Sequence, residues 1–450
     1  MPGEELRGLL CEASTVTSEL VDRDLAAVWH PFTQHALWPA DDPLVIDRGE
    51  GAYLFDTEGR RYLDGVASLW VTVHGHRTPE INDAITAQLG RLDHSTFLGL
   101  THEPGIRVAE ELLRIAPAGL SKVFFAGDGS SAAEAAIKMA YQAASQRGED
   151  RPLYVHCAEG YHGDTLGAVS LGGVELFHAT YRPLLIETRM VSSPGVLAAG
   201  QTRAERATQV LDEMRVLLER EGSRVCAIVV EPMVQAAGGM LTHDASFLRG
   251  VRALCDSSGA AMLVDEVATG IGATGRWFAV DHAGVSPDLM VVGKRLTGGV
   301  LPLSAVLAGD AIYEPFLGSA SSGRTFFHGH TYTANPLCCA AALANLSLMH
   351  ERGTVARAAS VGERIGAGLA SLARYDGVSE IRRIGTMTGV EVRPVRERTG
   401  FEVCRAARRK GVIVRPLGDV VIVMPPLGIS DAELDELLAA VDESVREVVQ

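Results

Sequence analysis

The middle of the chain alternates short apolar runs with longer stretches of helical periodicity. The runs are rich in β-branched residues, as is typical of strands that are buried on both faces of a sheet. Six of them are predicted strands: Lys122–Ala126, Leu153–His156, Cys226–Val230, Met262–Val264, Leu289–Val292 and Ser304–Leu307. Predicted helices lie between strands at Ala132–Ala144, Ala204–Glu221 and Phe247–Ser257. This alternation predicts an α/β fold with a mostly parallel sheet that is covered by helices.

The pattern changes after Asn335-Pro336, where a long Ala/Leu-rich helix is expected to run to about His350. A last helix is expected after Ser430-Asp431-Ala432-Glu433, which reads as a capping box and is followed by apolar residues at helical spacing. Strands are expected between these helices, at Val390–Val395, Val412–Val414 and Val420–Val423. Such a mixture of elements predicts a smaller α+β domain at this end of the chain.

The domain organisation follows from these patterns and from length. Residues 1–75 are too few to bury a core by themselves, so we expect them to join residues 340–450 in the smaller domain. Residues 76–339 should form the large domain. The chain has 450 residues, of which 47% are hydrophobic and 22% charged, a balance that excludes disorder over most of its length.

Charge and targeting signals exclude several classes of function. The chain carries 41 Lys+Arg against 56 Asp+Glu, a net charge of −15, so binding to nucleic acid is not expected. No apolar stretch approaches the ~20 residues of a membrane helix, and the first residues lack the apolar core of a secretory signal. The seven scattered cysteines are typical of reduced thiols. We therefore expect a cytoplasmic protein without a membrane segment.

The most specific chemical signal is an acid and a lysine that follow two predicted strands. Asp265-Glu266 comes directly after Val264, and Gly293-Lys294 directly after Val292. The carboxyl ends of parallel strands are where open α/β sheets bind their ligands. A poorly solvated lysine near an acid has the depressed pKa that a Schiff-base lysine needs. On the residues alone, an ion pair that caps the two strands is the alternative.

A glycine-rich turn before a predicted helix is a second candidate site. Gly127-Asp128-Gly129-Ser130-Ser131 follows a strand, and its amides could bind an anion at the positive end of a helix starting at Ser131. A capping box of Ser131 and Glu134 is the alternative. The turn and Gly270–Gly275 also match dinucleotide-binding patterns. We disfavour that interpretation because no acid closes the next strand after the turn and no convincing helix follows Gly275.

Three weaker signals remain. Tyr161 follows a strand, where its ring could stack on a planar cofactor or pack in the core. Arg415 could bind a carboxylate or simply be solvated at the surface. The histidines of His74-Gly75-His76 and His328-Gly329-His330-Thr331 suggest a metal, but no Cys or carboxylate completes a ligand set at the right spacing, so no metal is expected.

Taken in order, GDGSSAAEAAIK, GYHGDT, EPMVQ, VDEVATG, GKRLTGG and HGHTYTANP resemble the class III aminotransferases of fold type I, which use pyridoxal 5′-phosphate (PLP). The resemblance covers nearly the whole chain. It implies the α/β fold of a fold type I PLP-dependent transferase and a homodimer that acts on small-molecule substrates.

The resemblance also implies roles for individual residues. Lys294 would carry the cofactor and move protons, Asp265 would keep the pyridine nitrogen protonated, and Tyr161 would stack on the ring and line the substrate pocket. Other residues would hold the cofactor: Gly129 and Ser130 at its phosphate, Gln235 near its hydroxyl, and Thr331 with His330 at the phosphate in the neighbouring subunit. The substrate pocket would be lined by Phe32, Leu69, Trp70, Gly329 and Arg415, with Arg415 on a substrate carboxylate.

Further stretches, among them VWHPFTQ and VRPLGDVVIVMPPL, are similar to the family members that aminate 8-amino-7-oxononanoate in biotin biosynthesis. The sequence departs from that pattern mainly in the substrate pocket, at Phe32, Leu69, Ala273 and His330, and at Asp128 in the phosphate turn. These changes bear on the amino donor, which we expect to be S-adenosylmethionine, with lysine as the alternative. The alternative function is another ω-aminotransferase, acting on diamines or ω-amino acids.

Overall fold

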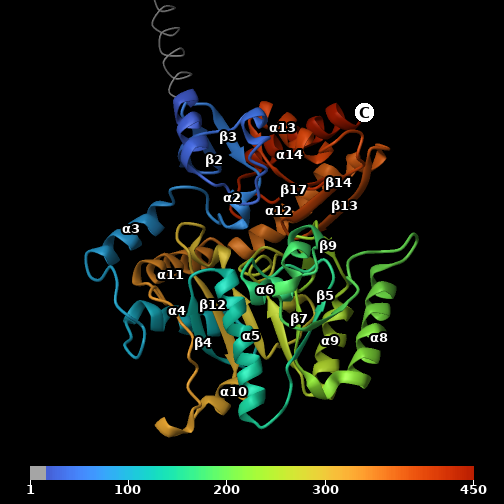
Figure 1. Cartoon of the computed structure of the whole chain (residues 1–450). Helices are drawn as coiled ribbons and strands as arrows, with labels where there is room; N and C mark the ends of the chain where they lie inside the picture. The colour runs from blue at the N-terminus through green and yellow to red at the C-terminus, as the bar shows by residue number, and fades with distance from the viewer. Residues whose placement is uncertain (1–16) are drawn as a thin grey trace, which may run out of the picture.

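The computed structural model describes residues 17–450 and contains a large unit and a smaller one (Figure 1). The large unit is built around a seven-stranded sheet with the order β4-β12-β11-β10-β7-β5-β6. Strand β12 is antiparallel to both of its neighbours, and the other strands run in one direction. The predicted α/β fold with a mostly parallel sheet is therefore confirmed.

All six strands predicted for the middle of the chain are present, and their ends differ by two residues at most. They are β4 (Leu120–Ala126), β5 (Leu153–Cys157), β7 (Val225–Val230), β10 (Ala261–Asp265), β11 (Leu289–Val292) and β12 (Ser304–Gly309). The central strands are buried along their whole length, which explains why continuous apolar runs revealed them.

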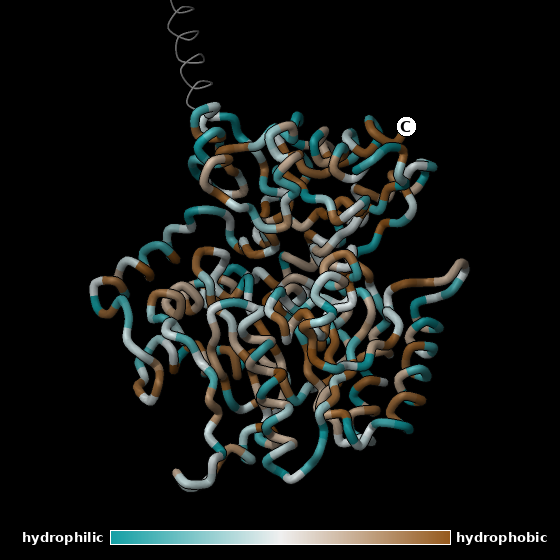
Figure 2. The backbone as a smooth tube through the Cα atoms, in the orientation of Figure 1, coloured by the Kyte–Doolittle hydropathy of each residue, from teal (hydrophilic) through white to brown (hydrophobic). Residues whose placement is uncertain are grey.

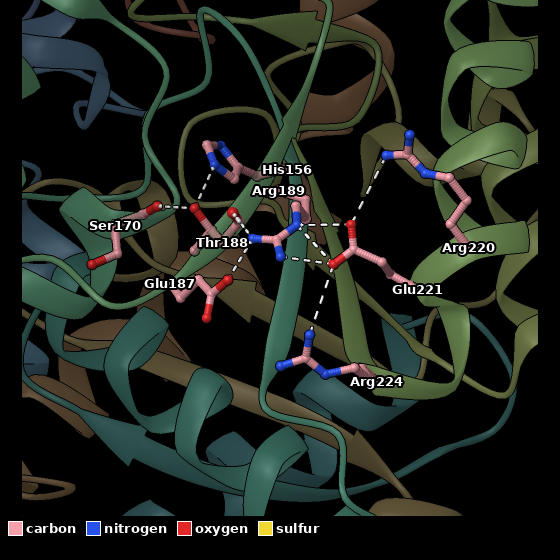
Figure 3. Close-up of polar contacts among 8 residues, drawn as sticks. All are labelled: His156, Ser170, Glu187, Thr188, Arg189, Arg220, Glu221 and Arg224. Carbon is pink, nitrogen blue, oxygen red and sulfur yellow. Dashed lines mark hydrogen bonds and ion pairs between the residues drawn. The ribbon is translucent and has the colours of Figure 1, made fainter.

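Strand β6 (Thr188–Val191), at one edge of the sheet, was missed because polar residues interrupt its apolar pattern. Figure 3 shows how those residues attach it to the rest of the unit. Arg189 bonds to Glu221 at 2.7 Å, at the end of α8 (Arg203–Glu221), and Thr188 bonds to the His156 ring at 3.1 Å. The charged edge is typical of sheets that avoid pairing with other chains.

Helices cover both faces of the large sheet. One face packs on α4 (Glu103–Ile115), α8, α9 (Ala245–Ser258) and α11 (Pro336–Glu351), and the other on the alanine-rich α5 (Gly129–Gln146). Helix α3 (Pro79–Leu89) packs against α11. Figure 2 shows hydrophobic residues along the central strands between these layers. Helix α5 begins shortly after β4 ends, so its first residues lie at the carboxyl ends of the parallel strands.

Both ends of the chain build the smaller unit, where the blue and red segments of Figure 1 lie side by side. Strands β1 (Ile46–Glu50), β2 (Tyr53–Asp56) and β3 (Arg61–Asp64) form a sheet that β15 (Val412–Ile413) joins in parallel to β3. The other sheet is antiparallel, in the order β13-β14-β17-β16. Its strands are β13 (Val378–Ile384), β14 (Met387–Val392), β16 (Arg415–Leu417) and β17 (Val420–Val423).

Details of the smaller unit refine the prediction. The strand expected at Val390–Val395 begins at Met387 and ends before Pro394, whose missing N–H cannot continue the ladder. The capping box of Ser430 and Glu433 is confirmed at the start of α14 (Asp431–Val449). Helices α12 (Thr354–Leu369) and α13 (Thr399–Arg409) complete the unit.

The boundary expected between residues 339 and 340 falls inside α11. Residues on both sides of it, Cys339 and Ala342, belong to the core of the large sheet, whereas the core of the smaller unit draws on α12 from Val361 onward. We propose to divide the units near Gly353 instead, where the chain turns with φ +59° between the two helices. The segment 1–75 begins in residues 1–16, outside the described part of the chain. Within residues 17–450, no helix has the length and apolar character needed to cross a membrane.

Candidate active site

A cavity of about 340 Å³ lies at the carboxyl ends of the central strands, against the smaller unit. It brings together Lys294, Asp265 and Tyr161, the three residues expected to be catalytic. Other residues predicted for the site also line it, namely Trp70, Gly129 and Ser130. The large sheet therefore presents a lysine, an acid and a glycine-rich helix start from the prediction to a shared space.

Lys294 follows β11 and starts a short turn with φ +45°. Its Nζ lies 5.1 Å from the centre of the Trp70 ring. Burial lowers the pKa of Lys294 to about 8, with Asp265 and Glu231 raising it and Arg295 lowering it. Among residues 17–450, Lys294 has no salt-bridge partner, so the ion pair considered as an alternative does not form. A much larger fraction of this amine is therefore neutral near physiological pH than for an ordinary lysine, as a nucleophilic lysine requires.

Asp265, at the end of β10, is bound on both oxygens. Oδ2 accepts from Nδ1 of His162 at 2.8 Å, and Oδ1 accepts from the Val267 amide at 2.9 Å. Burial lowers the pKa of His162, but the hydrogen bond to Asp265 and its charge outweigh burial, and the pKa of His162 is raised. The contact with His162 holds the Asp265 carboxylate in place at the edge of the cavity.

Glu231 is a further titratable group that the sequence analysis passed over. It follows β7 at the same edge of the sheet, lines the cavity, and accepts from the amides of Tyr161 at 3.1 Å and Ala236 at 2.9 Å. Burial raises the pKa of Glu231 to about 7; the charge of Asp265 adds to this, and His162 opposes it. The rule that selected Asp265, an acid directly after a buried strand, would have found Glu231 too.

The glycine-rich turn forms the start of α5, which begins at Gly129 and not at Ser131 as expected. Asp128 caps the helix, accepting from the N–H of Ser131 at 2.9 Å and from its hydroxyl at 2.8 Å. The capping box of Ser131 and Glu134, which was the alternative interpretation of this turn, does not form, because the Glu134 carboxylate accepts from the Gly167 amide at 2.7 Å.

This helix start has the features of an anion site. Ser130 Oγ lies 2.9 Å from the hydroxyl of Thr165, which also lines the cavity. A Cβ on Gly129 would stand only 2.8 Å from Val267, so a side chain there would fill the cradle. The Asp128 carboxylate is engaged by Ser131, which limits its conflict with an anion bound at the helix start.

Tyr161 forms one wall of the cavity. Its hydroxyl donates to Asp164 at 2.8 Å, and its ring stacks on that of His178 with centroids 6.3 Å apart and 14° between planes. Burial and the Asp164 contact raise the pKa of Tyr161, so the phenol stays protonated at neutral pH. The tyrosine is therefore a neutral, fixed, aromatic surface beside Lys294.

Phe32 and Arg415 line a second hollow, of about 470 Å³. The Phe32 ring packs edge-on against Phe177, which packs edge-on against Tyr161, so aromatic rings connect the two hollows. Burial lowers the pKa of Arg415, and Tyr161 partly offsets this. Within residues 17–450 the Arg415 guanidinium has no ion pair and no hydrogen bond. It is therefore available to a carboxylate from outside the chain.

The structure does not bring every predicted residue to the cavity. Gln235 is buried behind it, where its amide donates to the Ala158 carbonyl at 2.7 Å and accepts from Ser193. Leu69 is exposed, beside the buried Trp70. Gly329, His330 and Thr331 lie outside the cavity lining. Thr331 is exposed, and its expected role in a neighbouring subunit stays a prediction.

The histidines considered for a metal have separate partners. His76 contacts Asp64 at 3.0 Å, His74 lies near the Asn345 carbonyl, and His328 lies 3.1 Å from Lys138. In the part of the chain that the structure describes, no group of three or more His, Cys, Asp or Glu could hold a metal ion.

The fold and the cavity lysine define a PLP-type transferase, and the comparisons with known proteins agree. The profile of the family described as "Aminotransferase class-III" matches residues 37–445. The chain is 46% identical to the adenosylmethionine-8-amino-7-oxononanoate aminotransferase of Nitratidesulfovibrio vulgaris, over 98% of this chain and 84% of that protein. This protein therefore belongs to the class III aminotransferases.

Solved structures give the same result. The crystal structure of the adenosylmethionine-8-amino-7-oxononanoate aminotransferase from Methanocaldococcus jannaschii superposes with a TM-score of 0.91 at 36% identity, covering 96% of this chain and 100% of that one. A PLP-bound amine transaminase from an uncultivated Pseudomonas species has a TM-score of 0.89 at 30% identity, covering 94% and 98%. The predicted fold type I α/β architecture is thus confirmed.

Proposed function

We propose that this protein is a PLP-dependent aminotransferase that converts 8-amino-7-oxononanoate to 7,8-diaminononanoate in biotin biosynthesis, with S-adenosylmethionine as the amino donor. The observation that carries the proposal is the cavity that a lysine with a lowered pKa shares with a buried aspartate and the start of α5. The names of the N. vulgaris and M. jannaschii relatives support the choice of substrates.

The cavity residues fit PLP on four points. The α5 start with the hydroxyls of Ser130 and Thr165 suits a phosphate, and the cradle at Gly129 leaves room for it. The Asp265 carboxylate could pair with a protonated pyridine nitrogen, and the Tyr161 ring could stack on the pyridine ring. Lys294 offers an amine for the aldehyde. When bound, PLP supplies an electron sink for the charge that develops at the donor carbon.

Residues of the two hollows would each have a separate role in the reaction. Lys294 would hold the cofactor and move the proton that leaves the α-carbon of the donor, for which a pKa near 8 is well matched. His162 would orient the Asp265 carboxylate by donating from Nδ1. Arg415 would bind the carboxylate of the oxononanoate, with Phe32 and Trp70 against its apolar chain.

We also infer that the protein acts as a homodimer in the cytoplasm. Large apolar side chains are exposed around the segment that carries Thr331, among them Leu98, Phe327 and Tyr332. A surface of this kind supports an interface, across which Thr331 would reach the partner's phosphate site. The six cysteines in the described residues are all buried and unpaired, which supports a reducing compartment.

The test is an assay of the purified protein with 8-amino-7-oxononanoate and each donor in turn, with diaminononanoate measured by mass spectrometry. We expect product with S-adenosylmethionine. If product forms with lysine and not with S-adenosylmethionine, lysine is the donor and the rest of the proposal stands. Amination of simple ketones or aldehydes, with no product from the oxononanoate under any donor, would instead identify an ω-transaminase.

A further inference from the structure

Helix α2 (Ala67–Trp70) is one turn of a left-handed helix. Its four residues have φ values of +47°, +46°, +72° and +69°, and none of them is glycine. The backbone N–H of Trp70 donates to Val66 at 2.9 Å, and that of Val71 donates to Ala67 at 2.9 Å. L-amino acids rarely adopt this conformation in succession, because Cβ comes too close to the following carbonyl. Such strain persists where the surroundings impose it, and it is common beside functional sites.

The strained turn places Trp70 in the wall of the cavity. Trp70 is only 5% exposed and lies over the Lys294 amine at 5.1 Å, whereas the preceding Leu69 is 44% exposed. The segment after the turn also touches the segment after Lys294, since a Cβ on Gly299 would lie 2.9 Å from the Val71 backbone. A change in the turn would therefore move the wall opposite the lysine.

Asp64 and His76 supply the contacts that hold the turn. Asp64 is fully buried, and its Oδ1 accepts from the Ser68 amide at 3.0 Å. Its Oδ2 accepts from the Ser68 hydroxyl at 2.7 Å and from Nε2 of His76 at 3.0 Å. Both of its oxygens are therefore committed to the turn or to the histidine behind it.

This pair is anchored to the smaller unit and not to the cavity. The Asp64 amide donates to the Ala52 carbonyl at 2.8 Å, and the His76 amide donates to Gly51 at 2.6 Å. A Cβ on Gly49 would lie 2.8 Å from His76, so the ring is packed directly against β1. The smaller unit thus fixes the carboxylate, and the carboxylate fixes the turn.

We propose that Asp64, supported by His76, is a positioning residue for transamination: it holds residues 67–70 in the left-handed conformation so that Trp70 forms the cavity wall over Lys294. The reactive atoms are not touched by Asp64 itself. The inference rests on the proposed aminotransferase function for its kinetic consequence, but the placement of Trp70 can be measured without substrate.

The test compares Asp64→Ala with Asp64→Ala combined with Ser68→Gly. Glycine adopts positive φ without a steric cost, so it should form the turn without the carboxylate. The readouts are the near-UV circular dichroism band of Trp70, defined as the difference between the wild type and Trp70→Phe, and kcat/KM. We expect Asp64→Ala to lose most of that band and about 10- to 100-fold in kcat/KM. The double variant should recover much of both, and Asp64→Asn should fall between Asp64→Ala and the wild type.

Asp56→Ala is the matched control. Asp56 is another buried aspartate of the same small sheet, bound to Arg60 at 2.7 Å and Tyr62 at 3.1 Å, away from the turn. It should lower the melting temperature and keep the Trp70 band. An unchanged band in Asp64→Ala, or a band that Asp56→Ala abolishes equally and Ser68→Gly does not restore, would overturn the proposal. If Asp64→Ala does not fold, the same comparison is made with His76→Gln. Should another substrate prove correct, the band test still decides the role of Asp64.

Discussion

Replacing Arg415 with alanine should weaken the binding of a carboxylate-bearing acceptor. The guanidinium is half-buried and has lost much of its water, yet within residues 17–450 it has neither an ion pair nor a hydrogen bond. Its neighbours in the same hollow are already engaged: Arg398 pairs with Asp41 at 2.8 Å, and Arg408 donates to the Asp42 carbonyl at 2.8 Å. Arg415 is therefore the arginine of this hollow that an incoming carboxylate can pair with.

The size of the effect follows from this state of the free protein. A charge-assisted, bidentate pair contributes on the order of 1.5–3 kcal/mol, and here the guanidinium is already partly desolvated before the substrate arrives. We therefore expect KM for the oxononanoate to rise roughly 10- to 150-fold in Arg415→Ala, at 1.4 kcal/mol per factor of ten. Arg415→Lys should recover part of the loss, because it keeps the charge and loses the planar fork.

Steady-state kinetics with the acceptor varied at saturating donor measures the effect, and cofactor absorbance checks that the site is intact. Arg408→Ala serves as the matched control, because it removes an arginine from the same hollow whose donors already go to backbone carbonyls. An unchanged KM in Arg415→Ala, or an equal rise in Arg408→Ala, would refute the assignment of Arg415 to the carboxylate.

Three further predictions concern the main cavity. Lys294→Ala should abolish transamination while the fold is kept, and borohydride reduction of the wild type followed by peptide mapping should label Lys294 and no other lysine. Asp265→Asn should retain cofactor but lose most of the rate, because a neutral amide cannot stabilise a protonated pyridine nitrogen as the carboxylate would. Turnover close to that of the wild type would contradict this. Glu231→Gln should change the pH dependence of stability. The pKa of Glu231 is raised in the folded state to about 7, so its contribution to stability is present at low pH and is lost as the pH rises to about 7 and above. Melting temperatures across pH 5–8 should fall less steeply with rising pH in Glu231→Gln than in the wild type, and parallel curves would show that Glu231 does not titrate there.

The parts of the site that could be predicted from the sequence share one physical feature. Asp265, Lys294 and Gly129 each follow a short apolar run that had to be a buried strand, and parallel strands bring their carboxyl ends to one edge. Local patterns therefore fixed their neighbourhood without any knowledge of the tertiary structure. Glu231 obeys the same rule, so its omission was a failure to apply the rule and not a limit of the sequence.

The second hollow could not be predicted in this way. Phe32 and Arg415 lie 383 residues apart, and they line the same hollow although Phe32 precedes β1 and Arg415 begins β16, in a different sheet. No periodicity in either segment signals that pairing. The resemblance to the class III aminotransferases, and not the residue pattern, placed them together. For Gln235 the resemblance and the structure differ. The resemblance places its amide near the cofactor, but in the structure that amide is hydrogen-bonded to Ala158 and Ser193.

The left-handed turn at Ala67–Trp70 is the feature that local sequence predicts least. Four L-residues in this conformation cost roughly 1–2 kcal/mol each, a total comparable to much of the ~5–15 kcal/mol by which a typical domain is stable. A chain selected only for folding would place glycine in such a turn or avoid it. Here the cost is offset by a buried carboxylate on Ser68, and the turn bears the tryptophan that faces Lys294. The strained turn, the Asp64 contact that holds it and the Trp70 wall of the cavity therefore lie at the same place in the fold. That coincidence favours a role in the reaction for Asp64 over a purely structural one.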